Sequence, residues 1–384
     1  MAMLSRRTLI AAMLASPMLA SKPPLRVTVI GAGAFGGWTA LHLRRRGADV
    51  TLLDAWGPGN SRASSGGETR VIRAIYGKDR VYVEMVKRAY ELWEQLGRSL
   101  YVETGTLWMH RGDDAYVRGS APILRDLGFP LEQLSLAEAK KRWPQIAFNG
   151  IQSVWLERRA GALLARQACS VVRDAFVEAG GTYRVEQVQP SIVESKQADV
   201  YVFACGPWLG KLFPGIPIEP TRQEVHFFGT PAGPTSWKTL PIWIDFGERI
   251  FYGIPDTHGR GFKVADDTRG AAIDPTTLER TPSNDSVSRA RKLLAERFPG
   301  LANAPVLESR VCQYENSPDG HLILDRHPNA PNVWIAGGGS GHGFKLGPAV
   351  GELLADAITK DREIPPLFRL ARLQDGKRST QWTG

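Results

Sequence analysis

The chain has 384 residues, of which 43% are apolar and 11 are tryptophan, and its net charge is +9. This length exceeds one ordinary hydrophobic core, so we expect two folded domains, and the apolar content excludes global disorder. The basic residues are dispersed rather than clustered on a face, which argues against nucleic acid as a partner. Three cysteines are too few for a disulfide framework and have no zinc-type spacing, so no metal site is expected.

The first 23 residues differ in composition from the rest of the chain. Ser5-Arg6-Arg7 precedes an apolar stretch that runs to Leu19 and ends in small residues. This order is typical of a twin-arginine export signal. The stretch is shorter than the roughly 20 apolar residues that span a bilayer, so no stable membrane span is expected. We therefore expect residues 1–23 to direct export to the periplasm; if the leader is unused, the protein stays cytoplasmic.

A dinucleotide-binding βαβ unit is predicted directly after the leader. An apolar strand ends at Gly31, and Gly33 and Gly36 follow at the spacing GxGxxG. The first glycine allows a tight turn, the second lets the backbone approach a pyrophosphate, and the third permits close packing of helix on strand. Asp54 ends the next strand, where a carboxylate can accept both ribose hydroxyls.

Two kinds of sheet are predicted in the rest of the chain. A helix over 163–179 and a strand over 200–204 extend the parallel sheet. Short strands between 224 and 265, broken by glycine and proline, favour an antiparallel sheet. A strand over 332–336 is followed by a glycine cluster (Gly337, Gly339 and Gly341) and a helix over about 348–358, which is again the nucleotide-binding pattern.

The predicted fold class is therefore α/β with two discontinuous domains. A Rossmann-type dinucleotide domain with a parallel sheet comprises residues 24–104, 152–211 and 316–384. A second, α+β domain built on an antiparallel sheet comprises residues 105–151 and 212–315 and is expected to bind the substrate.

Six motifs go beyond a generic dinucleotide fold: Gly31-Ala-Gly33-Ala-Phe-Gly36, Gly67-Glu-Thr-Arg70-Val-Ile-Arg73, Arg142-Trp-Pro144, Gly259-Arg-Gly-Phe-Lys263, Val311-Cys312-Gln-Tyr314 and Gly341-His-Gly-Phe-Lys345. Together they resemble the family of monomeric sarcosine oxidase and N-methyl amino acid oxidases, FAD-dependent amine oxidases of the D-amino acid oxidase superfamily. The resemblance covers nearly everything after the leader and implies FAD as the cofactor.

The resemblance also implies roles around the flavin. Cys312 matches the residue that forms a thioether to the flavin ring, so the FAD is expected to be covalent. Lys263 matches a lysine held over the ring, where its charge stabilises the anion formed as oxygen is reduced. Arg70 matches an arginine beside the flavin. Gly337, Gly339, Gly341 and Lys345 are expected to contact the cofactor together with the first glycine motif.

For the substrate, the resemblance implies that Arg73 and Lys345 bind a carboxylate, one by a bidentate fork and the other as a point charge. Tyr252 and Tyr314 match aromatic residues that line the amine pocket. Two positions depart from the family: Asp267 stands where the family has a histidine, and Trp243 stands where it has a pocket methionine. These departures put sarcosine itself in doubt as the substrate.

The expected activity is oxidation of the C–N bond of a secondary amino acid, N-methylated or cyclic, or of a related amine to an imine, with O2 reduced to H2O2 by a monomeric enzyme. Three alternatives remain open from the sequence: an amine dehydrogenase that passes electrons to a quinone or a protein, a flavin-binding protein without turnover, and an NAD-dependent dehydrogenase. No residue is clearly placed as the base that deprotonates the amine.

Overall fold

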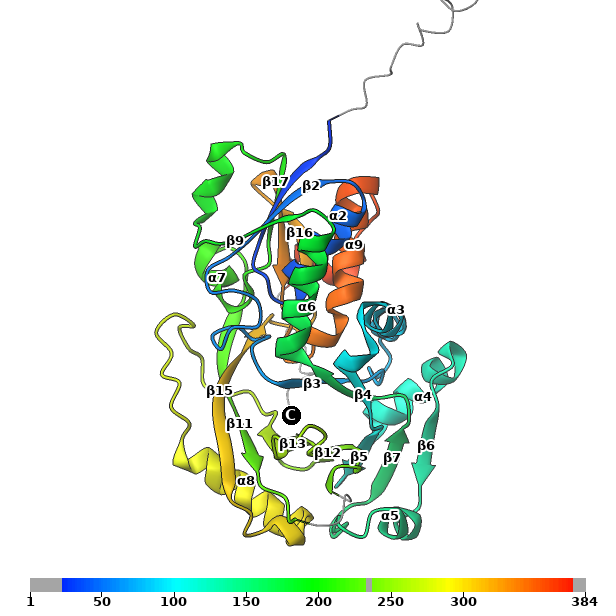
Figure 1. Cartoon of the computed structure of the whole chain (residues 1–384). Helices are drawn as coiled ribbons and strands as arrows, with labels where there is room; N and C mark the ends of the chain where they lie inside the picture. The colour runs from blue at the N-terminus through cyan, green and yellow to red at the C-terminus, as the bar shows by residue number, and fades with distance from the viewer. Residues whose placement is uncertain (1–22, 233–236, 376–384) are drawn as a thin grey trace, which may run out of the picture.

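Three β-sheets organise the part of the chain that the computed structural model describes, residues 23–232 and 237–375. A six-stranded sheet lies in the upper part of Figure 1, an eight-stranded sheet in the lower part, and a three-stranded sheet between them. Within the described ranges, no helix combines the length and apolarity needed to cross a membrane. The predicted leader lies outside these ranges except for its last residue, so export stays a prediction.

The six-stranded sheet is built around the predicted βαβ unit. In spatial order its strands are β16 (Ile323–His327), β17 (Ala330–Gly337), β10 (Val200–Phe203), β1 (Arg26–Ile30), β2 (Asp49–Asp54) and β9 (Thr182–Val185). All neighbouring pairs are parallel except β16–β17. Val29 and Leu52 have no exposed surface, as expected for a parallel sheet that is covered on both faces.

Four helices cover this sheet and its neighbours: α2 (Ala34–Arg45), α3 (Arg80–Leu96), α6 (Ala165–Glu178) and α9 (Gly347–Lys360). Helix α2 packs against both α6 and α9, and α3 packs against α9 (Figure 1). The approach of α2 and α9 depends on Gly351, where a Cβ would lie 2.5 Å from the carbonyl carbon of Trp38. Helix α6 begins two residues later than predicted because residues 161–164 form a strand.

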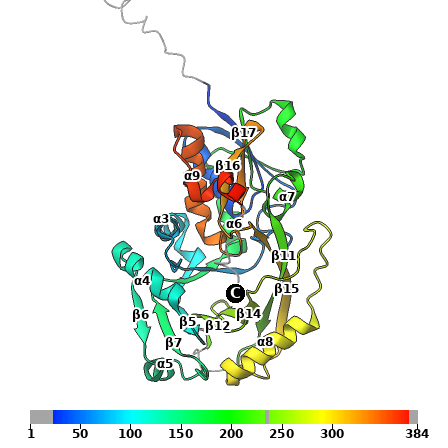
Figure 2. The ribbon, with the colours of Figure 1, turned by 180° about the vertical axis from the view of Figure 1, so that it is seen from behind.

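The eight-stranded sheet is antiparallel except for one pair. Its strands, in spatial order, are β15 (Val306–Asn316), β11 (Glu219–Phe228), β14 (Phe262–Asp266), β13 (Ile250–Ile254), β12 (Ile242–Phe246), β5 (Thr106–His110), β7 (Ser153–Glu157) and β6 (Leu131–Leu134). Helix α8 (Asn284–Arg297) contacts β11 and β14 on the side away from the six-stranded sheet (Figure 2). Helices α4 (Ala115–Leu127) and α5 (Leu136–Arg142) contact the β6–β7 end.

The parallel pair β12–β5 joins the two chain segments that were expected to form the second domain. Strand β7 pairs with β5, so it belongs to this sheet, although the predicted boundary at residue 152 assigns it to the cofactor domain. The three-stranded sheet β3 (Thr69–Ile72), β8 (Gly161–Leu164) and β4 (Tyr101–Glu103) lies between the two large sheets. The α/β fold class is confirmed, with the antiparallel sheet extended by one strand beyond the prediction.

Candidate cofactor and active site

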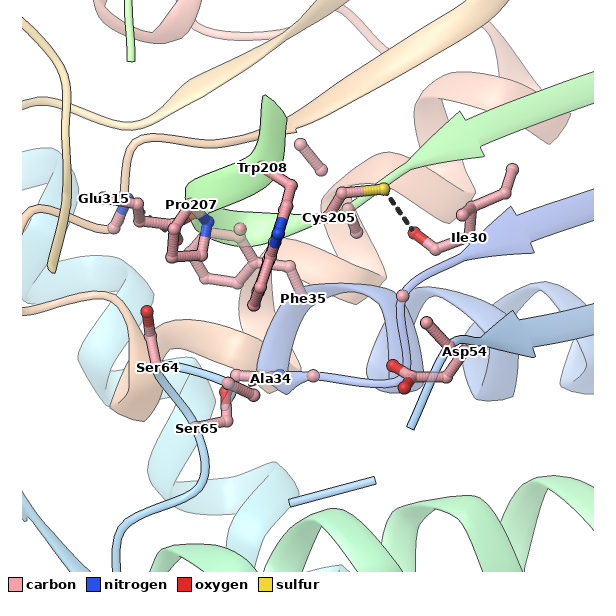
Figure 3. A pocket seen from close by; sticks show the side chains of 18 of the residues that line it. Ile30, Ala34, Phe35, Asp54, Ser64, Ser65, Cys205, Pro207, Trp208 and Glu315 are labelled. Atoms are coloured by element: carbon pink, nitrogen blue, oxygen red, sulfur yellow. Dashed lines mark hydrogen bonds between the residues drawn. The ribbon is translucent and has the colours of Figure 1, made fainter. Parts of the chain in front are cut away.

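A cavity of about 570 Å³ opens at the carboxyl ends of four parallel strands. It is lined by residues from the end of β1, the end of β2, the turn after β10 and the loop after β17 (Figure 3), among them Gly31, Gly33, Asp54, Cys205 and Gly339. This edge of an open parallel sheet is where dinucleotides bind in proteins of this architecture.

The glycine motif shapes the inner wall of this cavity. At Gly31 the backbone has φ of 105°, and a Cβ there would lie 2.3 Å from the carbonyl oxygen of Ala204. At Gly36 a Cβ would lie 1.8 Å from the carbonyl oxygen of Gly31, so only glycine lets α2 start this close to β1. Gly33 lines the cavity as the N-cap of α2, and a helix N-terminus favours an anion, although the first N–H of this helix, that of Ala34, already donates to Oγ of Ser65 at 3.1 Å.

Asp54 lines the cavity and also holds two loops in place. Its Oδ2 accepts the N–H of Ala32 at 2.7 Å, and its Oδ1 accepts the N–H groups of Trp56 and Gly57 at 2.9 and 2.8 Å. A carboxylate offers about four lone-pair positions, so these bonds leave room for one further donor. The binding of ribose hydroxyls by Asp54 stays a prediction.

The C-terminal glycine cluster divides between two tasks. Gly339 and Gly341 line the cavity as predicted. Gly337 does not: a Cβ there would lie 2.3 Å from Cδ1 of Leu209, so this glycine permits packing of β17 against the helix after β10, α7 (Leu209–Leu212). Its predicted contact with the cofactor is replaced by a packing role.

Glu315 is a cavity residue that the sequence analysis missed. Its carboxylate lies between Gly339 and the turn after β10 (Figure 3), and its Oε1 accepts the N–H of Gly339 at 3.2 Å. Its Oε2 is buried and has no hydrogen-bond partner among the described residues. Burial raises the pKa of Glu315 to about 7. A buried oxygen without a partner is costly in a folded protein, so this wall of the cavity is incomplete without a ligand.

A second cavity, of about 640 Å³, lies between the eight-stranded sheet and the C-terminal glycine loop. Arg70, Tyr314, Gly341 and Phe344 line both cavities, so the two spaces meet at these residues. The residues expected to contact the substrate line the second cavity, with the exception of Trp243: Arg73, Tyr252, Asp267, Tyr314 and Lys345.

Arg73 and Lys345 both line the second cavity, Lys345 as a buried and Arg73 as a partly buried side chain. Lys345 is 3% exposed, and its Nζ donates to the carbonyl oxygen of His342 at 2.8 Å. Burial lowers the pKa of Lys345 well below its ordinary value, and the charge of Arg73 lowers it further. The Arg73 guanidinium lies over the rings of Tyr76 and Trp108, at 4.9 and 5.2 Å. The arrangement is suited to an anionic group of a ligand. Lys345 lines this second cavity and not the first, so its predicted contact with the cofactor is not supported by its position.

A buried carboxylate, also missed from the sequence, stands behind these cations. Glu157 has no exposed surface and accepts hydrogen bonds from the Ala74 N–H and, at 3.3 Å, from Nε1 of Trp108. Burial raises the pKa of Glu157 to about 7, although the neighbouring Arg73 and Lys345 act in the opposite direction. Arg73 and Lys345 thus favour the carboxylate form of Glu157, whereas burial favours its acid form.

Lys263, on β14 of the eight-stranded sheet, contacts β3 of the three-stranded sheet. It is 2% exposed, its Nζ donates to the carbonyl oxygen of Thr69 at 3.2 Å, and the same atom lies 5.1 Å from the ring centre of Tyr252. Burial lowers the pKa of Lys263 to about 7, with a further contribution from Arg70. Lys263 lines a third cavity, of about 200 Å³, and neither of the two larger ones.

Cys312 lies beside Arg70, which lines both large cavities, but Cys312 itself lines neither of them. The Arg70 Nη2 donates to Sγ of Cys312 at 3.5 Å. Cys312 and Tyr314 are two residues apart on β15, so their side chains emerge from the same face of the sheet. Cys205, by contrast, lines the first cavity and points its Sγ at the carbonyl oxygen of Ile30, 3.6 Å away (Figure 3).

The structure corrects the prediction for Trp243. Its side chain has no exposed surface and packs on Phe262 and Phe298, with ring centres 6.0 and 4.8 Å apart, on the α8 side of the sheet. Side chains alternate along a strand, so it is the next residue of β12, Ile244, that lines the second cavity. The position matched to the family methionine thus belongs to the core.

The residues of the first cavity fit FAD. Three features suit a dinucleotide: the close backbone packing at Gly31 and Gly36, the N-terminus of α2, and the unpaired buried oxygen of Glu315. The junction at Arg70 and Tyr314 allows one end of the ligand to reach the second cavity. Bound FAD supplies the chemistry of hydride acceptance, and the protein supplies orientation and charge.

Comparison with known proteins agrees with this fit. A family model described as FAD dependent oxidoreductase matches residues 26–357. Monomeric sarcosine oxidase of Bacillus sp. (strain B-0618) is 33% identical over 366 residues, which cover 88% of this chain and 93% of that protein. Peroxisomal sarcosine oxidase of Mus musculus is 30% identical over 378 residues, 92% of this chain and 96% of that protein.

Among solved structures, an L-proline dehydrogenase from P. horikoshii has a TM-score of 0.79 at 23% identity, covering 92% of this chain and 99% of that chain. At this identity the likeness shows the fold alone. The sequence relatives and the family model show more, and the chain belongs to the family of FAD dependent oxidoreductases, as a relative of the sarcosine oxidases.

Proposed function

We propose that this protein oxidises the C–N bond of a secondary α-amino acid, N-alkylated or cyclic. The observation that carries the proposal is the pair of basic side chains, Arg73 and Lys345, in a cavity that meets the cavity proposed for FAD at Arg70 and Tyr314. A carboxylate bound by this pair would place the carbon next to the amine near the junction. Holding the reacting carbon close to the cofactor lowers the entropic part of the activation barrier and so accelerates the reaction.

The aromatic wall of the second cavity suits the rest of such a substrate. Tyr252 and Tyr314 stand on adjacent faces of the site, and Phe344 and Trp108 add apolar surface. The names of the sequence relatives, which are sarcosine oxidases, support an N-methylated substrate class. The cavity of about 640 Å³ also has room for substrates larger than sarcosine.

We further propose that the electron acceptor is O2 and that the enzyme is a monomer. The support for O2 is Lys263, a buried cation close to Tyr252 and Arg70, which can stabilise the anion formed when oxygen takes up an electron. The support for a covalent flavin is the hydrogen bond to Cys312 from Arg70, a residue that lines both large cavities. Its thiol would be the attachment point.

Hydrogen peroxide formation in air tests the proposal. The purified, flavin-loaded protein is given N-methyl amino acids, proline and pipecolate, each paired with the amine that lacks the carboxylate. We expect peroxide from one or more of the amino acids and little from its decarboxylated partner. If the flavin is reduced but no peroxide forms, the protein is a dehydrogenase; if no amine reduces it, the substrate proposal is wrong.

A further inference from the structure

Asp267 is a carboxylate that lines the cavity proposed to bind the substrate. It follows β14 and lines the cavity next to Tyr314. The Tyr314 hydroxyl donates to its Oδ1 at 2.5 Å, and its backbone N–H donates to the carbonyl oxygen of Ile250 at 2.8 Å. Both bonds hold the Asp267 side chain in one place at the cavity wall.

The groups around Asp267 define its charge. Burial raises the pKa of Asp267, and the charge of the neighbouring Asp266 acts in the same direction. The hydrogen bond from Tyr314 and the charges of Arg73 and Lys263 act in the opposite direction and favour the carboxylate. Tyr314 keeps its proton because burial raises its own pKa well above the ordinary value, so it remains a donor to Asp267.

Two further residues complete the set of groups that act on this carboxylate. Tyr252, on β13, faces Asp267, and burial together with this carboxylate raises the pKa of its hydroxyl, so it too stays neutral. Lys345 acts on Asp267 from the loop after β17. The cavity wall therefore carries Arg73 and Lys345 together with three carboxylates: Asp113 and Glu248, which are exposed, and Asp267, which is partly buried and hydrogen-bonded to Tyr314.

This separation of charge matches an amino-acid zwitterion. A carboxylate on Arg73 and Lys345 leaves the adjacent ammonium in need of an anionic partner, and Asp267 is a carboxylate lining the same cavity. The geometry points to Asp267 as the group that binds the substrate ammonium and accepts its proton. This inference rests on the proposed function and supplies the base that was unassigned in the sequence.

In this step the N–H proton of the substrate ammonium moves to a carboxylate oxygen of Asp267, and the nitrogen recovers its lone pair. FAD, when bound, would take up the hydride equivalent from the neighbouring C–H, and water would hydrolyse the resulting iminium ion to the amine and a carbonyl product. A substrate that stays protonated on nitrogen cannot give up this hydride, so Asp267 would permit turnover at neutral pH.

Anaerobic stopped-flow reduction of the flavin by an N-methyl amino acid tests the inference. With Asp267→Asn we expect the reduction rate at pH 7 to fall by about 100-fold or more, the usual contribution of a general base. The rate should then rise about tenfold per pH unit as free amine becomes available in solution, and should approach the wild-type rate near the pKa of the substrate ammonium. Asp267→His should recover part of the neutral-pH rate, because it restores a base.

Asp113→Asn is the matched control. Asp113 lines the outer part of the same cavity, its side chain is 75% exposed, and it pairs with Arg118. Its substitution should leave the pH profile of flavin reduction unchanged. An Asp267→Asn enzyme with the wild-type rate and pH profile would overturn the inference while leaving the proposed function intact. A wild-type enzyme that no amino acid reduces would contradict the proposed function instead.

Calorimetric binding to the wild-type enzyme gives a readout that does not depend on a variant or on turnover. Trimethylglycine carries a carboxylate and a fixed cation, and methoxyacetate carries the carboxylate alone. We expect the affinity for trimethylglycine, relative to methoxyacetate, to fall as the pH is lowered and Asp267 is protonated. A ratio that does not change with pH would contradict an ion pair between Asp267 and the substrate cation.

Discussion

The ammonium nitrogen of Lys263 donates a hydrogen bond to the carbonyl oxygen of Thr69, 3.2 Å away, and so links the eight-stranded sheet to the three-stranded sheet. Thr69 precedes Arg70, which lines both large cavities. A cation on β14 is thereby fixed at the place where the two cavities meet. Its burial lowers the pKa of Lys263 to about 7, so its charge is sensitive to its surroundings in the neutral range.

Lys263→Met is expected to slow the reaction of the reduced enzyme with O2 and to leave reduction by substrate nearly unchanged. The reason is that Lys263 lines neither the substrate cavity nor the cofactor cavity but stands beside their junction. Lys345→Met is the matched comparison and should have the opposite effect, with weaker substrate binding and normal reoxidation. Stopped-flow measurement of each half-reaction separates the two. Fast reoxidation of Lys263→Met would remove the oxygen role.

The proposed oxygen role also predicts a pH dependence. A lysine whose pKa is lowered is protonated only below that pKa, so its charge is lost as pH rises. For the wild type we expect the reoxidation rate to decline above about pH 7, or above a higher pH if the reduced flavin anion raises the pKa of Lys263. The Lys263→Met variant should show no such decline. The same decline in the variant would assign the titration to another group.

Arg73→Ala is expected to weaken the binding of carboxylate substrates by about 2 kcal/mol or more, which is about 30-fold in affinity. The loss arises because the substrate carboxylate would be left with Lys345 alone. The dissociation constant from anaerobic flavin reduction measures this effect. An amine without a carboxylate should bind the variant and the wild type equally, and an unchanged constant for both ligands would rule out the proposed carboxylate site.

Gly36→Ala is expected to destabilise the cofactor domain by about 3 kcal/mol and to yield protein with little flavin. A Cβ at this position would lie 1.8 Å from the carbonyl oxygen of Gly31, so β1 and α2 would have to move apart. Gly215→Ala is the control, because nothing lies within 4 Å of a Cβ there. Thermal unfolding and the ratio of flavin to protein absorbance give the comparison. Equal flavin content in both variants would contradict the proposed need for glycine at position 36 in FAD binding.

Glu315→Gln is expected to make FAD binding independent of pH near neutrality. Burial raises the pKa of Glu315 to about 7, and a hydroxyl of bound FAD that donates to its unpaired Oε2 would favour the carboxylate over the acid. FAD affinity should therefore fall as pH is lowered below about 7. The titration is done in a Cys312→Ser background, so that binding is reversible. Glu186→Gln, at the rim of the same cavity, is the control and should keep the wild-type profile.

The parts of the site that the sequence predicts are those with a local physical cause. Gly31 and Gly36 occupy positions where a Cβ would meet backbone atoms, and this constraint is visible in the spacing of the motif. Cys312 and Tyr314 share a face because they are two residues apart on one strand. These relationships depend on residues close together in the chain.

The parts that the sequence does not predict depend on partners far apart in the chain. The orientation of Trp243 depends on which face of β12 lies toward α8. The match of Trp243 to the family methionine does not tell which face this is. Glu157 lies behind Arg73 only because β7 joins the eight-stranded sheet, where the predicted domain boundary did not place it. Glu315 becomes a cavity residue through the loop that carries Gly339.

The central claim is that this chain transfers a hydride equivalent from a secondary amino acid to its FAD. The most direct test is the visible absorbance of the flavin in the purified enzyme under nitrogen, recorded while an N-methyl or cyclic amino acid is added. The claim predicts loss of the oxidised-flavin band with a substrate that carries a carboxylate, and return of the band when oxygen is admitted. A flavin that stays oxidised with every secondary amino acid tested would contradict it.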